Sequence, residues 1–337
     1  MNVEQPASLE RYLAQRGYAM EESRILAGGV SNNSVLVRLR DGSSIVVKQA
    51  REQLKSAAEW KSDPRRIEQE ALAMEWLSRW TPTGSIPRLL FLDKASHILG
   101  MDAVPEPHHE WKRLLLSGRI EMDHFSKFGE LLAAIHRGSY LERREVEPLF
   151  RDQSFFFSLR LEPYYFHAAN NEPRAAVFLR ELVRETQARR VALVHGDYSP
   201  KNVLVRGDQL VLLDHEAANF GEPAFDAGFA LAHFLSKALH LPESRERLRT
   251  GAREFWRAYC RCLPAIPEFR DVSERVVRHT LGCLLARVAG KSLLEYLTPQ
   301  ERDRQRAIVL RCMEKVPANV ENLIDEFIVL ALEPERG

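Results

Sequence analysis

The chain has 337 residues, 45% of them apolar, so it is long enough for one large or two medium domains with a substantial buried core. Its 48 lysine and arginine residues nearly balance 47 aspartate and glutamate residues, and the net charge of +1 provides no general attraction to nucleic acid or to an anionic membrane. No secretory signal and no segment of transmembrane length stands out, so we expect a cytoplasmic protein.

The first hundred residues alternate strand patterns with a single helical pattern. Asp41-Gly42 is a favoured hairpin turn between two β-branched runs. Asp63 as N-cap and Pro64 as first helical residue predict a helix that ends near Trp80. A first strand is expected to end around residues 25–26, and further strands are expected at 34–39, 43–47, 86–93 and 96–103. The expected order is three strands, one helix and two strands.

The segment "DAVPEP" from Asp102 carries two prolines and predicts an extended connector, after which the sequence becomes mostly helical. We therefore expect an N-terminal lobe of residues 1–103 and a C-terminal lobe of residues 104–337. Helical patterns occur at 123–137, 173–189, 225–239, 245–262, 272–289 and from 299 to the C-terminus. Only the stretch 193–214 interrupts them, and it predicts an apolar hairpin.

A glycine-rich segment lies between the first two strands. "LAGGVSNNSVLV" contains Gly28, Gly29, Ser31 and Asn32, whose free backbone N–H groups and short polar side chains can approach phosphate groups. Taken alone, the segment favours the alternative interpretation, a plain Gly-Gly hairpin turn.

Lys48 ends the apolar run "SIVVKQ", and the helix that follows provides its partner. At 100° per residue, Glu70 projects between Met74 and Leu77 on the apolar face of the helix. An unpaired carboxylate on such a face is costly to bury, so we predict a Lys48–Glu70 ion pair. The lysine would also hold the α- and β-phosphates of a nucleotide, and a purely structural salt bridge is the alternative.

The hairpin in the helical half carries polar residues at both ends. If its turn is formed by residues 207–209, with Arg206 opposite Leu210, the extended register places Asn202 across from Asp214. An amide oxygen and a carboxylate at that spacing predict a magnesium site, to which Glu216 would add a third oxygen donor.

Asp197 lies five residues before Asn202, in a loop that Gly196 and Pro200 force to turn sharply. An Asp-x-x-x-x-Asn pair followed by a metal-binding aspartate is the arrangement used for phosphoryl transfer in kinases. The spacing therefore indicates Asp197 as a proton acceptor.

The two motifs "HGDYSPKNVLV" and "LLDHEAANFGEPAFD" resemble those of the aminoglycoside phosphotransferase and choline-kinase-like superfamily of small-molecule kinases. The resemblance implies an α+β, bilobal, protein-kinase-like fold with a small β-rich N-lobe and a larger, mainly helical C-lobe. It also implies Asp197 as catalytic base, Asn202 and Asp214 as magnesium ligands, Asp226 as a buried support of the catalytic loop, and a structural role for His195.

The same resemblance implies that adenine pairs with the carbonyl of Asp102 and the N–H of Val104. Two departures from protein kinases favour a small substrate. Ser199 stands where protein kinases usually carry lysine, and Asp214-His215-Glu216 replaces Asp-Phe-Gly. The Asp-x-Glu form is similar to that of methylthioribose-kinase-like members, in which the glutamate also binds metal.

The sequence thus predicts an ATP- and Mg²⁺-dependent kinase that phosphorylates a hydroxyl group of a small molecule of aminoglycoside, amino-alcohol or sugar type. A catalytically silent, nucleotide-binding regulatory protein with the same fold is the alternative. Oligomeric state, nucleotide preference and the role of Lys201 are left open, as are the roles of Arg287 and Lys291, for which substrate contact and a helix end compete.

One further alternative is a binding module for acidic partners. Arg249, Arg253, Arg257 and Arg261 recur every four residues and would form a basic stripe on one helix face. The interleaved aromatic residues are typical of a buried side, which favours an ordinary solvated face instead.

Overall fold

The computed structural model describes residues 1–26, 32–53 and 61–333. The chain divides into two compact units. Unit 1 comprises Met1–His108 and Leu204–Ala217, and unit 2 comprises the remainder, His109–Val203 and Ala218 onward. The segment Leu204–Ala217, which contains most of the predicted hairpin, therefore packs with the N-terminal part of the chain, although the sequence suggested a break near residue 103.

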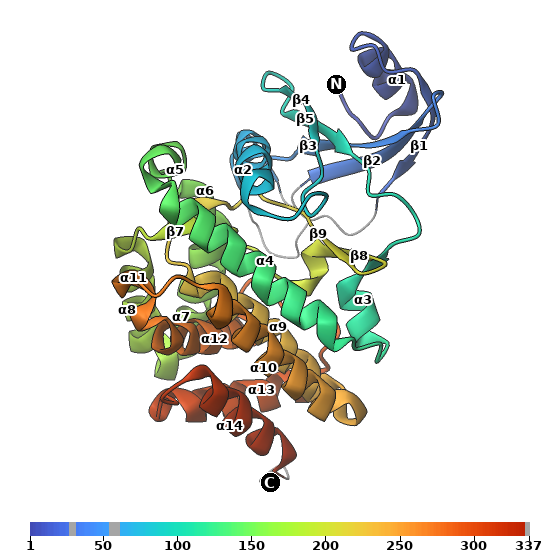
Figure 1. Cartoon of the computed structure of the whole chain (residues 1–337). Coiled ribbons are helices and arrows are strands. Elements are labelled where there is room, and N and C mark those ends of the chain that lie inside the picture. Colours follow the sequence, from blue (N-terminus) through green and yellow to red (C-terminus); the bar gives the residue numbers. More distant parts are fainter. Residues whose placement is uncertain (27–31, 54–60, 334–337) are drawn as a thin grey trace. The chain divides into compact units, whose positions relative to one another are not determined.

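Unit 1 is built on a five-stranded antiparallel sheet with the strand order β1-β2-β3-β5-β4 (Figure 1). Its elements in chain order are α1 (Pro6–Ala14), β1 (Met20–Ile25), β2 (Asn32–Leu39), β3 (Ser44–Ala50), α2 (Arg66–Trp80), β4 (Leu89–Asp93) and β5 (Ile98–Asp102). The expected order of three strands, one helix and two strands is confirmed. Helix α1 was not predicted.

The core of the sheet follows from alternation along the strands. Val35 of β2 pairs with Val47 of β3, which in turn pairs with Gly100 of β5. Both valines are buried, as expected for β-branched residues on the inner face of a sheet. Helix α2 packs on β3, β4 and β5 through a face that includes Ile67 and Met74, both almost fully buried.

Helix α2 begins at Arg66, two residues later than predicted. The Asp63 carboxylate accepts the backbone N–H of Arg65 at 2.8 Å, and the Arg66 N–H donates to the Asp63 carbonyl at 3.2 Å. These bonds close a turn ahead of the helix. Asp63 therefore stabilises that turn and is not the N-cap.

Unit 2 is mainly helical. Its longer elements are α4 (Met122–Leu141), a π-helix (Phe157–Phe166), α8 (Ala176–Ala188), α9 (Ala224–His240), α10 (Arg245–Cys262), α12 (Val272–Ala289), α13 (Pro299–Glu314) and α14 (Val320–Leu332). Shorter ones are β6 (His109–Glu110), α3 (Trp111–Leu116), α5 (Arg143–Leu149), α6 (Ser154–Phe156), α7 (His167–Asn171), β7 (Ala192–Val194), β10 (Asn219–Gly221) and α11 (Pro267–Arg270), with short 3₁₀ turns at Pro173–Ala175, Pro200–Asn202 and Pro242–Ser244.

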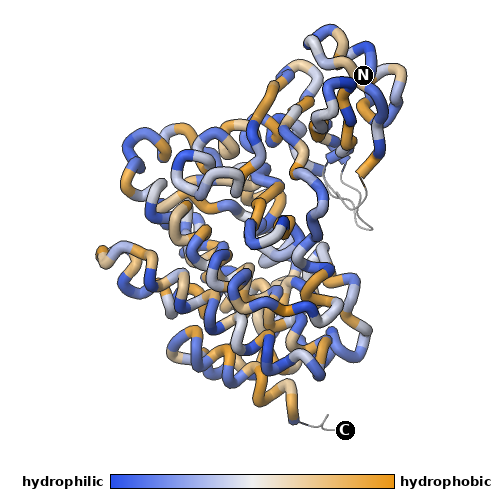
Figure 2. Tube along the Cα trace, turned by 45° about the vertical axis from the view of Figure 1, so that its right-hand side comes forward, coloured by the Kyte–Doolittle hydropathy of each residue, from blue (hydrophilic) through white to orange (hydrophobic). Residues whose placement is uncertain are grey.

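Helices α4 and α10, α10 and α9, and α9 and α12 pack side by side in unit 2 (Figure 1). Glycines permit two of the close approaches. A Cβ on Gly129 of α4 would lie 2.3 Å from the Phe255 carbonyl oxygen of α10, and one on Gly228 of α9 would lie 2.6 Å from the His279 Cβ of α12. Hydrophobic and hydrophilic residues are interspersed along the helical part of the chain (Figure 2). Helix α10 buries one face, whereas nearly every residue of α9 is buried.

The expected α+β class is confirmed, with a small antiparallel sheet and a mainly helical remainder. The helical patterns at 245–262 and 272–289 coincide with α10 and α12. The single helix expected from residue 299 is wrong, because Asn319 caps a separate helix by accepting the Asn322 N–H at 2.9 Å. Within the described ranges, no helix combines the length and apolar composition that a membrane crossing requires.

Candidate functional site

The predicted ion pair between β3 and α2 is confirmed. Lys48 Nζ lies 2.6 Å from Glu70 Oε1, and both side chains are buried, with relative exposures of 8% and 0%. The helical periodicity placed Glu70 on the face that packs against the sheet, and that face brings it to the lysine. A role of the pair in nucleotide binding stays a prediction.

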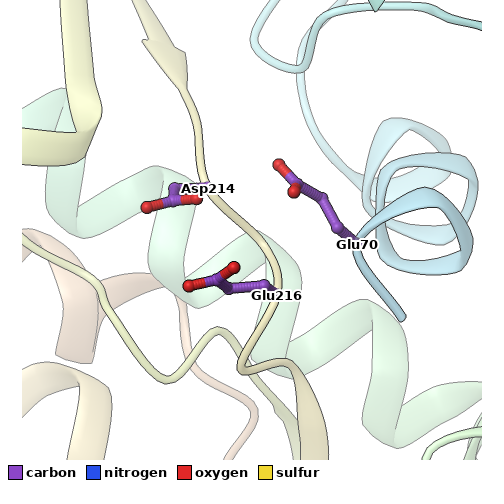
Figure 3. A group of neighbouring side chains, drawn as sticks. All are labelled: Glu70, Asp214 and Glu216. Atoms are coloured by element: carbon purple, nitrogen blue, oxygen red, sulfur yellow. The ribbon is translucent and has the colours of Figure 1, made fainter. Parts of the chain in front are cut away.

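Two carboxylates from the segment after strand β9 (Gln209–Leu212), Asp214 and Glu216, lie near Glu70 (Figure 3). Lys48 Nζ lies 3.2 Å from Asp214 Oδ1. Asp214 has a φ of +67°, in the left-handed region that non-glycine residues seldom adopt and that is found most often at functional positions. The ligand oxygens of Glu70, Asp214 and Glu216 all lie within 4.8 Å of one another.

Glu216 is held by two donors. Arg66 Nε of α2 and Asn32 Nδ2 of β2 each lie 3.1 Å from Glu216 Oε2. Arg66 is completely buried, and Glu216 is 4% exposed. The ion pair therefore fixes the orientation of Glu216, and neither Arg66 nor this contact was foreseen from the sequence.

The unit 1 carboxylate cluster, defined as Lys48, Arg66, Glu70, Asp214 and Glu216, contains three carboxylates and two cations. Burial raises the pKa of Glu70 to about 7, with Asp214 and Glu216 adding to the effect and Lys48 opposing it. Burial alone would lower the pKa of Lys48, but the charges of Glu70 and Asp214 raise it overall. Among the described residues the cluster thus holds more carboxylates than cations, largely in a buried setting, which suits a cation with a preference for oxygen ligands.

In unit 2, a loop after strand β7 presents Asp197. Gly196 has a φ of +79°, which only glycine adopts without strain. The N–H groups of His195 and Gly196 donate to the buried Asp226 carboxylate at 2.6 and 2.9 Å, and the Asp197 N–H donates to His195 Nδ1 at 3.1 Å. The structural roles implied for Asp226 and His195 are confirmed.

The Asp197 carboxylate is held from two sides. Asn202 Nδ2 donates to Asp197 Oδ2 at 2.6 Å, and Arg160 Nη2 lies 2.8 Å from the same oxygen. Arg160 Nε also donates to the Gly196 carbonyl at 2.6 Å. Sequence reasoning missed Arg160. Its only local signal was a single arginine in the aromatic segment "SFFFSLRLEPYYF", which forms α6 and the π-helix.

The predicted turn of the hairpin is wrong by one residue. Strand β8 (Val203–Arg206) is followed by β9 from Gln209, so the loop consists of Gly207 and Asp208 alone. Gly207 has a φ of +56°, and two-residue loops of this kind match the twist of hairpin strands. The pairing of Asn202 with Asp214 depended on a three-residue turn, so it no longer follows from the hairpin.

The structure describes only some of the other residues that were predicted to bind the nucleotide. Gly28, Gly29 and Ser31 lie outside the described residues. Asp102 ends strand β5, and its carboxylate pairs with the exposed Arg88 at 2.9 Å. The next residues, including Val104, have no regular secondary structure, and their contact with adenine stays a prediction.

The stripe of α10 is paired within the chain. Arg249 and Arg253 contact Asp325 of α14, with Arg249 Nη2 at 2.7 Å from Asp325 Oδ1. Arg257 lies 3.4 Å from Glu321 of α14, and Arg261 lies 3.2 Å from Glu130 of α4. These acidic partners neutralise much of the stripe, which weakens the hypothesis of a binding module for acidic partners.

Comparisons with known proteins concern the family and the fold of the chain. The family model described as "Phosphotransferase enzyme family" matches residues 22–271, well over half of the chain. The methylthioribose kinase of Erwinia tasmaniensis is 25% identical over 271 residues, which cover 68% of this chain and 67% of that protein. The methylthioribose kinase of Yersinia pestis (strain Pestoides F) is 24% identical over 275 residues, 70% of this chain and 65% of that protein. The chain thus spans about two thirds of the length of these relatives.

Solved structures show the same fold at low sequence identity. A choline/ethanolamine kinase family protein from Mesorhizobium loti has a TM-score of 0.57 and 17% identity, covering 96% of this chain and 97% of that chain. The amicoumacin kinase hAmiN, solved with AMP-PNP, Ca²⁺ and Ami, has a TM-score of 0.57 and 11% identity, covering 94% of this chain and 96% of that chain.

Proposed function

The chain belongs to the phosphotransferase enzyme family, and we propose that this small-molecule kinase uses ATP and Mg²⁺ to phosphorylate a hydroxyl group of its acceptor. The curated relatives are named methylthioribose kinases, which are small-molecule kinases. A reaction that consumes ATP also fits the cytoplasmic location expected from the sequence.

The main support for the proposal is that one buried ammonium group contacts two carboxylates. Lys48 Nζ reaches Glu70 at 2.6 Å and Asp214 at 3.2 Å. In kinases, the lysine–glutamate pair and the metal-binding aspartate must both be in place before phosphoryl transfer. A purely structural salt bridge would require only one carboxylate, whereas here a second carboxylate is supplied from the segment after a separate strand.

The residues present fit a magnesium ion. The donors are carboxylate oxygens, their charge exceeds that of the neighbouring cations, and Glu70 Oε2 is buried without a hydrogen-bond partner in the described chain. We assign Asp214 and Glu216 as ligands. The role of Asn202 as a further ligand stays a prediction from the sequence. When bound, Mg²⁺ would neutralise charge on the transferring phosphoryl group.

Asp197 is assigned as the general base that accepts the proton of the acceptor hydroxyl. Asn202 and Arg160 hold its carboxylate at 2.6 and 2.8 Å, and Asp226 fixes the backbone of the loop. A carboxylate with a fixed orientation can meet the hydroxyl proton in one geometry, which is how positioning contributes to phosphoryl transfer.

The direct test measures ADP formation with ATP and Mg²⁺ across a panel of sugars, amino alcohols, hydroxy acids and aminoglycosides. We expect ADP formation that depends on one acceptor class and stops when EDTA removes the metal. ATP binding without ADP formation for any acceptor class would instead favour a silent regulatory protein.

A further inference from the structure

Helix α9 carries a buried lysine that lacks an acidic partner. Lys237 has a relative exposure of 0%, and its Nζ donates to the backbone carbonyl of His233 at 3.3 Å. Within the described residues, no carboxylate forms an ion pair with it. Burial, followed by the positive charges of Lys112 and Arg287, lowers its pKa to about 7. A buried ammonium without a counter-charge is costly, so its presence calls for an explanation beyond packing.

Single polar atoms beside α9 also lack partners among the described residues, although Arg287 Nη1 itself donates to the Ser292 carbonyl and hydroxyl at 2.7 and 2.8 Å. His233 lies one turn before Lys237, and Arg287 comes from the neighbouring helix α12. His233 Nε2, Arg287 Nε and the Tyr296 hydroxyl are buried atoms without a hydrogen-bond partner in the part of the chain that the structure describes. The Tyr296 ring centroid lies 5.2 Å from Lys237 Nζ. We call His233, Lys237, Arg287 and Tyr296 the α9 cationic cluster.

The charges around this cluster are predominantly positive. Burial, then Arg287, Lys237, Lys112 and Lys201, hold the pKa of His233 well below its usual range. The acidic groups that act on Lys237 are Glu295 and Glu110. Glu295 pairs with Lys112, and Glu110 pairs with the exposed Arg113 at 3.2 Å. The nearby carboxylates are thus already engaged, and an excess of positive charge faces buried, unpartnered donors.

The cluster is linked to the proposed base through one aromatic ring. Arg287 Nη1 donates to the Tyr164 hydroxyl at 2.8 Å, and the Arg160 guanidinium lies 5.8 Å from the centroid of the same ring. Arg160 in turn contacts Asp197. Arg160 and Tyr164 both lie on the π-helix, an irregularity that occurs frequently at functional sites. The cationic cluster therefore lies on the side of unit 2 that also positions Asp197.

We propose that the α9 cationic cluster binds an acidic group, a carboxylate or a phosphate, carried by the small molecule that the enzyme phosphorylates. The proposal rests on the proposed function and narrows its acceptor class. Lys237 and Arg287 supply charge, while His233 Nε2 and the Tyr296 hydroxyl supply hydrogen bonds that complete the shell of an anion. The excess positive charge disfavours polycationic acceptors such as aminoglycosides.

Binding is tested by calorimetry with inorganic phosphate and malonate as anion probes and choline as a cationic control, on the full chain. A saturating, non-hydrolysable ATP analogue with Mg²⁺ excludes the nucleotide site. Wild type is compared with Lys237→Met and with Lys315→Met, a matched exposed lysine. We expect an anion, but not choline, to bind wild type, about tenfold or more weaker binding by Lys237→Met, and a change within about twofold for Lys315→Met.

The two probes separate the sources of the acidic group. Preference for malonate identifies a carboxylate, and preference for phosphate identifies a phosphorylated acceptor. ADP formation is then compared for matched acceptors, with glycerate and glycerol 3-phosphate as the acidic compounds and glycerol as the neutral one. In wild type, an acidic acceptor should have a higher kcat/KM than glycerol. In Lys237→Met, that difference should disappear.

The inference is overturned if neither phosphate nor malonate binds wild type. It is also overturned if Lys237→Met binds the anion with the same affinity as wild type. Acceptor-dependent ADP formation from neutral or cationic acceptors, without anion binding, removes the inference and keeps the kinase function. Anion binding that depends on Lys237, with no ADP formation from any acceptor, keeps the anion site and removes the kinase function. Because Met replaces a buried unpaired charge, Lys237→Met should remain folded, which thermal unfolding checks.

Discussion

The two units each contain a buried cluster of charged side chains, and the clusters are unbalanced in opposite directions. In unit 1, three carboxylates share Lys48 and Arg66. In unit 2, Lys237 and Arg287 have no carboxylate ion-pair partner among the described residues, and His233 adds an unpartnered nitrogen. Counted over the described residues, each cluster therefore has a surplus of the charge opposite to that of its proposed ligand, a metal ion in the first case and an acidic group in the second.

The contrast shows that a buried charge is most informative when its partners are counted. A balanced pair such as Arg16 and Asp93, whose charged groups lie 2.8 Å apart, stabilises a fold without implying a ligand. An unbalanced cluster destabilises the free protein, and a ligand of opposite charge relieves that cost. Removal of a surplus buried charge and the breaking of a buried ion pair should consequently have opposite effects on stability.

The largest effect is expected for Asp214→Asn in the unit 1 cluster. Loss of the proposed metal ligand should reduce kcat about 10³-fold or more. Titration of ADP formation with Mg²⁺ measures it, and Asp208→Asn, an exposed residue of the same hairpin, serves as the control. A variant with wild-type kcat and an unchanged Mg²⁺ requirement would remove Asp214 from the metal site.

In the unit 2 cluster, the substitution Lys237→Met should stabilise the protein. The folded-state pKa of Lys237 is about 7, below its usual 10.5, so the unfolded chain binds more protons between these values and wild-type stability rises with pH across that window. The variant should exceed wild type by on the order of 4 kcal/mol near pH 6.5 and by only about 1 kcal/mol near pH 9.5.

Urea unfolding of both proteins at the two pH values measures this difference, with Lys315→Met as a control that should show no such pH dependence. A Lys237→Met variant that is less stable than wild type at the lower pH would contradict the account of Lys237 as an uncompensated buried charge.

Glu70→Gln should act in the opposite direction. Removing this carboxylate leaves Lys48 buried with Asp214 alone, and breaking a buried pair destabilises proteins by about 3 kcal/mol. Glu68→Gln on the same helix is the matched control, because Glu68 pairs with the exposed Lys94 at 3.3 Å, and surface pairs contribute about 0–1 kcal/mol. The free energy of unfolding of both variants is measured by urea unfolding near pH 8. Equal decreases for the two variants would show that the Lys48–Glu70 pair contributes no more to stability than a surface pair.

These clusters also show what a sequence can and cannot predict. The Lys48–Glu70 pair was predictable because it depends on a helix face and an adjacent strand, both set by local periodicity. Asp197, Asn202 and Asp214 were predicted as site residues from short-range spacing within two neighbouring motifs, and their catalytic and metal-binding roles stay predictions. Arg160 was not, because it reaches Asp197 from a π-helix far away in the sequence, and nothing in the local pattern predicts that geometry.

Errors at element ends have equally specific causes. The predicted start of α2 ignored that Asp63 could bond to Arg65 before the helix began, and the hairpin register depended on whether Gln209 belonged to the turn or to the strand. Both choices differ by small local energies that hydrophobic periodicity does not report. The α9 cationic cluster required contacts among α9, α12 and the following segment, which only the tertiary structure supplies.

The smallest effect is expected on the arginine stripe of α10. Arg257 and Glu321 are both about half exposed and lie 3.4 Å apart. Arg257→Ala should change the free energy of unfolding by less than about 1 kcal/mol and leave kcat unchanged. A large loss of activity would instead return the stripe to consideration as a binding surface.

The central claim, phosphoryl transfer with Asp197 as base, is tested most directly by following transfer of labelled γ-phosphate from ATP to the acceptor in wild type and Asp197→Asn side by side. ATP affinity is measured in parallel. The account predicts labelled product from wild type, a 10²- to 10⁴-fold slower rate for Asp197→Asn as is typical of a lost general base, roughly unchanged ATP binding, and wild-type rates for Asp208→Asn. Equal transfer rates for wild type and Asp197→Asn would contradict it.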